Sequence, residues 1–222
     1  MKTIKIAIDG PAGAGKSTIA KAVAGALGFV YIDTGAMYRA IGLAAVNQGI
    51  DPSVAADVEG ILDSVDVKIC HTEEGQQIYL NGENVSGKIR TPEISSAASH
   101  VAVIPAVRLK LVELQRKLAE ETNVIMDGRD IGTYVLPDAQ LKIFLTADPE
   151  ERAKRRYLEL QEKGVNTTLE EVLSEMKFRD KNDSSREFAP LKPAEDSVMV
   201  DSTSLSLEET IAKITALAQA LR

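Results

Sequence analysis

The stretch Gly10-Pro11-Ala12-Gly13-Ala14-Gly15-Lys16-Ser17 decides the fold of this chain of 222 residues. It has the pattern G-x-x-x-x-G-K-[S/T], it follows the apolar segment 4–8, and helix-forming residues continue to Leu27, before Gly28. A glycine-rich loop between a strand and a helix directs backbone N–H groups at a phosphate, and the positive helix end adds favourable potential. The stretch therefore predicts a P-loop that binds a nucleoside triphosphate.

Two side chains of this loop suit the triphosphate. Lys16 can reach the β- and γ-phosphates, and the Ser17 hydroxyl can bind the Mg²⁺ that accompanies ATP. We expect the whole loop to contact ATP, through Gly10, Pro11, Ala12, Gly13, Ala14, Gly15, Lys16, Ser17 and Thr18.

The composition excludes several other classes of protein. The net charge of −7 argues against a large nucleic-acid surface, and 4% aromatic residues are too few for a base-stacking platform. A single cysteine, Cys70, cannot form an internal disulfide and fits a reducing cytosol. The longest run without a charged residue is 94–107, shorter than the ~20 apolar residues of a membrane span. The N-terminus also lacks the apolar core of a signal peptide. We therefore expect a cytoplasmic protein without nucleic-acid or membrane partners.

Short apolar segments recur between helical ones. Segments 29–32, 124–126, 141–145 and 198–200 resemble the first strand, which favours a parallel sheet of about five strands covered on both faces. Three later helix starts are marked by Asp148-Pro149, by Thr167 with Glu170 and by Ser206 with Glu209. The predicted fold class is α/β, a P-loop three-layer sandwich.

The middle of the chain has a different pattern. Segments 65–70 and 76–80 read as strands, and Asn81-Gly82 is a strong hairpin signal. We expect a small antiparallel element inserted at about 61–91. A helix then begins at Pro105, with an apolar face of Val107, Leu111, Leu114 and Leu118.

Two common P-loop classes do not fit. The guanine-reading Asn-Lys-x-Asp segment of GTPases is absent, and segment 124–126 ends in Asp127-Gly128-Arg129-Asp130 rather than the Asp-Glu of AAA-type motors. An arginine at the carboxyl end of a parallel strand faces the ligand crevice and suits a second anion, although Asp-Gly also marks surface turns.

Arginines recur where such an anion would bind. Arg39 follows the second strand and Arg129 the third, and the later ones are Arg152, Arg155 and Arg156 on one helix face, and Arg179 and Arg186. Each alone would be expected to be a solvated surface charge. Their density beside a P-loop in an acidic chain favours phosphoryl transfer between two anions.

These segments together resemble the bacterial cytidylate kinases over essentially the whole chain. The resemblance is carried by residues 9–17, Asp33-Thr34-Gly35-Ala36-Met37-Tyr38-Arg39, Val85-Ser86-Gly87-Lys88-Ile89-Arg90, Asp127-Gly128-Arg129-Asp130-Ile131-Gly132-Thr133 and Ala189-Pro190-Leu191. It implies transfer of the γ-phosphoryl group of ATP to CMP or dCMP with Mg²⁺. It also implies one kinase domain, 1–222, with a monophosphate-binding insertion at about 61–91 and a helical lid at about 149–166.

The resemblance also assigns residue roles. Arg39, Arg129 and Arg186 would hold the acceptor phosphate. Ser99, Arg108 and Asp130 would bind cytosine, and Arg179 and Asp183 the sugar. Lys16 and Arg129 would be catalytic together with Arg155 and Arg156 of the lid. From the sequence alone, Arg108 is expected on a solvated helix face and Ser99 as an ordinary helix residue.

The chemistry of the bases agrees with this assignment. Cytosine presents an amine that can donate a hydrogen bond to the Asp130 carboxylate, whereas uracil presents an oxygen there. Two alternatives stay open at this stage: a kinase of another small acceptor, such as UMP or a metabolite alcohol, and a regulatory protein that binds nucleotide without turnover. We expect a monomer whose partners are ATP, CMP and dCMP.

Overall fold

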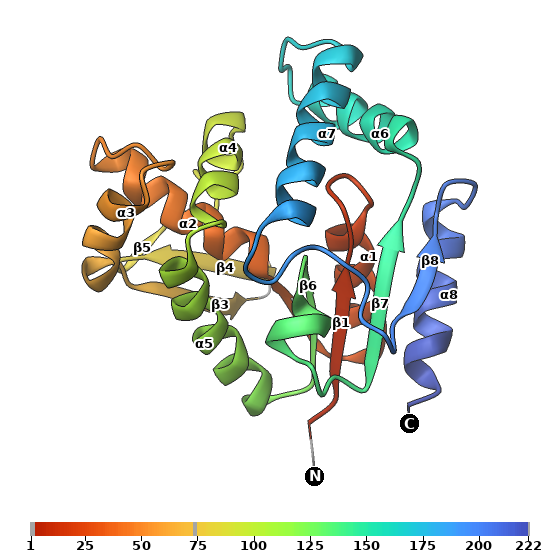
Figure 1. Ribbon diagram of the computed structural model, residues 1–222. Coiled ribbons are helices and arrows are strands. Elements are labelled where there is room, and N and C mark those ends of the chain that lie inside the picture. Colours follow the sequence, from red (N-terminus) through yellow and green to blue (C-terminus); the bar gives the residue numbers. More distant parts are fainter. Residues whose placement is uncertain (1–2, 73–74, 222) are drawn as a thin grey trace. The chain divides into compact units, whose positions relative to one another are not determined.

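The computed structural model describes residues 3–72 and 75–221, and the chain divides into two compact units (Figure 1). The first unit comprises residues 1–31 and 122–222, and the second comprises residues 32–121. The boundary falls inside strand β2, which runs from Val30 to Asp33.

The first unit is built on a five-stranded sheet with the strand order β2-β6-β1-β7-β8. Its other strands are β1 (Lys5–Asp9), β6 (Val124–Gly128), β7 (Leu141–Thr146) and β8 (Val198–Asp201). Strands β1, β6, β7 and β8 pair in parallel, and Asp9 at the end of β1 lies opposite Gly128 at the end of β6. The predicted α/β class with about five strands is confirmed, and the loops that follow β1 and β6 start at the same sheet edge.

Four helices and one π-helical turn complete this unit. They are α1 (Lys16–Leu27), η2 (Ile131–Val135), α6 (Pro149–Glu162), α7 (Leu169–Ser185) and α8 (Leu207–Gln219). Helices α1 and α8 pack together, and buried Ile19, Val23 and Ile214 join Ile6 and Ile125 of the sheet in one apolar cluster. This cluster fixes α1, and with it the P-loop, against the strands.

The helix ends largely follow their sequence signals. Gly28 ends α1 at φ 69°, Asp148 is the N-cap of α6, and Ser206 forms the expected capping box with Glu209. The pairing of Thr167 with Glu170 was wrong. Helix α7 instead begins one residue later, where the Thr168 hydroxyl accepts the Glu171 N–H and the Glu171 carboxylate accepts the Thr168 N–H.

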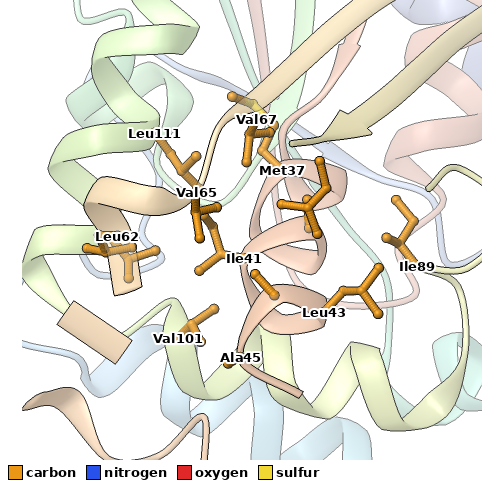
Figure 2. Packing of buried hydrophobic residues seen from close by; sticks show 14 of the residues in the cluster. Met37, Ile41, Leu43, Ala45, Leu62, Val65, Val67, Ile89, Val101 and Leu111 are labelled. Atoms are coloured by element: carbon orange, nitrogen blue, oxygen red, sulfur yellow. The ribbon is translucent and has the colours of Figure 1, made fainter. Parts of the chain in front are cut away.

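The second unit combines helices with a separate antiparallel sheet. Its elements are α2 (Thr34–Asn47), α3 (Ala55–Ile61), η1 (Leu62–Ser64), β3 (Val67–Thr72), β4 (Gly75–Leu80), β5 (Glu83–Asn84), α4 (Pro92–Val101) and α5 (Pro105–Glu121). The sheet order is β3-β4-β5, and the predicted hairpin turn is present, with φ 49° at Asn81 and 84° at Gly82. Figure 2 shows its core, in which Met37 and Ile41 of α2 lie near Val65 and Val67.

Helix α5 begins at Pro105 as predicted, but it buries a different set of side chains. Val107 and Leu111 are fully buried, whereas Leu114 is only half-buried. Arg108 is 1% exposed, so the expectation of a solvated face for it was wrong. None of the helices in the described ranges has the length and apolar character that a membrane crossing requires.

Gly10 gives a test of the close packing at the sheet edge. A Cβ atom at Gly10 would lie 1.9 Å from the backbone oxygen of Leu145 on β7, so the backbone would have to move. We expect Gly10→Ala to lower the free energy of unfolding by ~1–3 kcal/mol, measured by urea titration. The control is Gly25→Ala at an exposed position of α1, where nothing lies within 4 Å of the added Cβ atom and a gain of ~0.5–1 kcal/mol is expected. Equal effects of the two changes would contradict the close approach.

Candidate active site

The P-loop presents an uncapped helix end. Gly13 and Gly15 have φ values of 71° and 85°, and Gly15 is the N-cap of α1 without any side-chain cap. The first turn of α1 contains no acidic residue. The N–H groups at this helix end are therefore suited to an anionic ligand.

Lys16 is almost completely buried at this helix end. Its Nζ donates a hydrogen bond of 2.7 Å to the Pro11 carbonyl. Burial and the nearby Arg129 guanidinium lower the pKa of Lys16 to about 7, although Asp127, Asp183 and Asp9 act in the opposite direction. A phosphate chain beside this ammonium group would favour its charged form.

Ser17 and Asp127 place two oxygen ligands together. The Ser17 hydroxyl donates to Asp127 Oδ2 at 2.8 Å, and the Tyr31 hydroxyl donates to Asp127 Oδ1 at 2.8 Å. A hydroxyl and a carboxylate are the donor types that Mg²⁺ prefers, so these residues fit the ion. Neither Asp127 nor Tyr31 was predicted from the sequence, although an acidic residue at the end of a strand was a signal for Asp127.

A cluster of alternating charges follows β6 and the end of α7. Arg129 Nε donates to Asp183 Oδ2 at 2.7 Å, and Arg186 lies 3.8 Å from Asp183 Oδ1 and 3.4 Å from Asp130 Oδ1. Burial alone would raise the pKa of Asp183, but the charge of Arg129 and its hydrogen bond lower it overall. Burial would lower the pKa of Arg129, and Asp183 raises it overall. Both groups are therefore charged at neutral pH.

Arg179 belongs to the same cluster. Burial and the like charge of Arg129 lower the pKa of Arg179, and the Nε atom of Arg179 is buried with no hydrogen-bond partner in the described chain. The first unit thus brings together five of the predicted acceptor-binding residues, namely Arg129, Asp130, Arg179, Asp183 and Arg186.

Asp9 ties the end of β1 to the turn beyond Arg129. Its two carboxylate oxygens accept the N–H groups of Ile131 at 2.8 Å and Gly132 at 2.7 Å. Burial raises the pKa of Asp9 to about 6, against the lowering effect of these two hydrogen bonds. This role of Asp9 was not predicted, because nothing in the local sequence indicates a contact with a turn 122 residues away.

The second unit has its own cationic site at the start of α2. Asp33 caps this helix by accepting the Ala36 N–H, and its Oδ2 atom also lies 2.8 Å from Arg39 and 3.2 Å from Arg90. Two guanidinium groups share one carboxylate, so a positive charge is left in excess. Arg39 was predicted, whereas Arg90 was seen only as part of a family segment.

The two predicted base-binding residues of this unit have unequal environments. Arg108 donates to the Ala102 carbonyl at 3.1 Å and lies 5.5 Å from the centre of the Tyr38 ring, a cation–π contact. Ser99 lies in α4, where its hydroxyl donates to the Ser95 carbonyl at 3.3 Å.

The three arginines of α6 have different surroundings. Arg152 is buried, and it donates to the carbonyls of Ala147 and Ala12 and pairs with Asp180 at 2.7 Å. Arg155 donates to the Ser202 carbonyl, and Arg156 pairs with Glu159 of the same helix. Only Arg155 and Arg156 are therefore accessible enough to exchange partners.

The fold and this site define a P-loop nucleotide-binding protein. The sequence profile described as Cytidylate kinase matches residues 6–220. The chain belongs to the cytidylate kinase family, as the resemblance of its segments predicted.

Individual relatives agree with this placement. A cytidylate kinase of Caldicellulosiruptor bescii is 56% identical over 214 residues, which cover 96% of this chain and 95% of that protein. A cytidylate kinase of Halalkalibacterium halodurans is 51% identical over 209 residues, 94% of each chain. An uncharacterized protein from Eubacterium ventriosum has a solved structure with a TM-score of 0.55 at 14% identity, covering 98% of this chain and 99% of that one. This last likeness concerns the fold alone.

Burial of Asp9 predicts a specific pH dependence of stability. Its pKa is about 6 in the folded chain against an ordinary 3.8, so the folded chain holds the proton more tightly than the unfolded chain. Stability therefore falls as the pH rises from about 4 to about 6, and the cost is fully present above that range. The rise from 3.8 to about 6 corresponds to roughly 3 kcal/mol.

The test compares the wild type with Asp9→Asn by urea unfolding at pH 4 to 8. Between about pH 4 and pH 6.5, the unfolding free energy of the wild type should fall by roughly 3 kcal/mol relative to that of Asp9→Asn. Above this range the difference between the two should stay constant. A constant difference over the whole range would show that the pKa of Asp9 is not raised.

Proposed function

We propose that this protein transfers the γ-phosphoryl group of ATP to CMP or dCMP, producing CDP or dCDP. The observation that carries this proposal is membership of the cytidylate kinase family over residues 6–220 together with a P-loop whose Lys16 lies beside a cluster of arginines and carboxylates. Such a transfer needs positively charged groups beside both the donor and the acceptor phosphate. It requires little covalent chemistry from the protein itself.

ATP binds through residues 10–18. The N–H groups at the start of α1 surround its phosphates, and the Lys16 ammonium group contacts the β- and γ-phosphates. Ser17 and Asp127 would hold Mg²⁺, which neutralises and orients the phosphate chain when bound. Tyr31 keeps the Asp127 carboxylate in place through the hydrogen bond to its Oδ1 atom.

The acceptor phosphate binds Arg129 and Arg186, and the family resemblance assigns Arg39 to the same phosphate. A nucleoside monophosphate is largely a dianion at neutral pH, since its second pKa is about 6, so no general base is needed. Arg129 and Arg186 are already charged and oriented by Asp183 and Asp130. Their role is to stabilise the transferring group, for which fixed charges are effective.

Asp130, Arg108 and Ser99 recognise cytosine, and Arg179 and Asp183 bind the sugar. The buried Nε atom of Arg179 supports this role, because a donor without a partner would gain one from a ligand. Residues 149–166 act as a lid, in which Arg155 and Arg156 leave Ser202 and Glu159 for the transferring phosphoryl group. The protein works as a cytoplasmic monomer.

The test is ATP consumption on a panel of CMP, dCMP, UMP and a metabolite alcohol. CMP and dCMP should stimulate turnover far above the rate with ATP alone. Faster turnover with UMP or the alcohol would assign a different acceptor. No stimulation by any of them would favour a regulatory protein that binds nucleotide.

Asp130 gives a sharper test of base recognition. Asp130→Asn replaces an acceptor-only carboxylate with an amide, so the preference for CMP over UMP in kcat/KM should narrow by ~1–3 kcal/mol. The matched control is Asp66→Asn, an exposed carboxylate paired only with Lys68 among the described ion pairs, which should leave the ratio unchanged. Since Asp130 also lies near Arg186, a purely structural role would lower both activities equally, together with the melting temperature.

A further inference from the structure

Asp180 of α7 connects the P-loop to the lid helix. Its Oδ1 atom accepts the backbone N–H of Ala12 at 3.2 Å, and its Oδ2 atom pairs with Arg152 at 2.7 Å. Arg152 in turn donates to the Ala12 carbonyl at 2.8 Å. Both polar groups of the Ala12 backbone are thus held by one ion pair between α6 and α7.

Close packing reinforces this connection. A Cβ atom at Gly13 would lie 2.6 Å from the Met176 side chain and 3.2 Å from the Arg152 carbonyl oxygen, so both helices contact the loop. Ala12, Ala153 and Met176 also belong to one apolar cluster. Figure 1 shows α6 and α7 side by side, with the loop that follows β1 near the C-terminal part of α7. A shift of the P-loop must therefore displace α7.

Helix α7 also carries groups assigned to the acceptor nucleotide. Arg179 directly precedes Asp180, and Asp183 follows within one turn and holds Arg129. One rigid helical turn thus carries the contact to the donor loop and the groups that bind sugar and orient Arg129. A helix transmits displacement over one turn because its backbone hydrogen bonds resist local change.

We propose that Asp180 is a positioning residue that couples occupancy of the P-loop by ATP to the affinity for CMP. The proposal rests on the function proposed above. When the phosphates of ATP bind in the loop, the Ala12 backbone and Asp180 fix the last turns of α7. Arg179 and Asp183 are then held in the orientation that binds CMP. Coupling of this kind is reciprocal, so CMP must strengthen ATP binding by the same factor.

The charge of Asp180 is essential to this link. Arg152 is buried, and its other hydrogen-bond partners among the described residues are the neutral carbonyls of Ala147 and Ala12. Removing the carboxylate leaves a buried cation without its counter-ion and releases the Ala12 N–H. Asp180→Asn retains one oxygen acceptor and volume, so it removes the charge with the least disturbance of packing.

The experiment measures the dissociation constant of CMP by calorimetry, with and without Mg²⁺ and the non-hydrolysable analogue AMP-PNP. In the wild type the analogue should tighten CMP binding by at least about 5-fold, the lower end of typical coupling between sites. In Asp180→Asn the factor should fall below about 2-fold, while CMP alone binds as in the wild type. Measured kcat/KM for CMP at saturating ATP should fall in parallel.

Glu150→Gln is the matched control, because Glu150 pairs with Lys177 and so also joins α6 to α7, but both side chains are exposed. It should keep the wild-type factor. An unchanged factor in Asp180→Asn, an equal loss in both variants, or a wild type without coupling would overturn the proposal. If Asp180→Asn melts below the assay temperature, Asp180→Glu is measured instead. It keeps the charge but displaces the carboxylate from the Ala12 N–H and Arg152, and only a factor lower than that of the wild type supports the positioning role. Absence of CMP-stimulated ATP consumption in the wild type would instead overturn the proposed function, and this inference with it.

Discussion

The buried ammonium group of Lys16 lies among three carboxylates and one guanidinium, and much of the first unit is arranged around it. Burial and Arg129 disfavour its charge, whereas Asp127, Asp183 and Asp9 favour it. Burial and Arg129 outweigh the carboxylates and lower the pKa of Lys16 to about 7, so the site disfavours the charged ammonium group relative to water. The negative charge of a triphosphate would remove that balance in favour of the charged form. Bound triphosphate therefore supplies the negative charge that stabilises the Lys16 ammonium group.

The carboxylates around this cation each have a second, structural task. Asp127 holds Ser17 and Tyr31, Asp9 holds the turn at Ile131, and Asp183 orients Arg129. Charge-assisted hydrogen bonds of this kind are stronger than neutral ones and specific in direction. The same device recurs in the second unit, where Asp33 caps α2 and also holds Arg39. In both units, fixed carboxylates keep cationic side chains in place before any substrate binds.

Local features of the fold could be predicted from the sequence, and distant contacts could not. The parallel strands, the hairpin at Asn81-Gly82 and the helix start at Pro105 all follow from short patterns that depend on neighbouring residues. The capping box of α7 was misplaced by one residue because Thr167 and Thr168 each have a glutamate three positions later. Thr168 forms the capping box because the folded helix begins at Leu169, which makes Thr168 the N-cap residue.

The same division applies to the candidate site. The P-loop and the arginine after β6 were recognisable, since both belong to contiguous motifs. Arg108 was expected in solvent, because the pattern of α5 does not reveal that Tyr38 and the Ala102 carbonyl surround its guanidinium group. Asp180 lies 168 residues from Ala12 in the sequence, so its contact with the loop is visible only in the folded chain.

The central claim is that the γ-phosphoryl group passes from ATP to CMP on this protein. The most direct measurement follows the label from γ-³²P-ATP in the presence of equimolar CMP and Mg²⁺, with nucleotides and inorganic phosphate separated by chromatography. The label should accumulate in CDP, in proportion to the ADP formed. Label that appears only as inorganic phosphate, with CMP unchanged, would contradict the account.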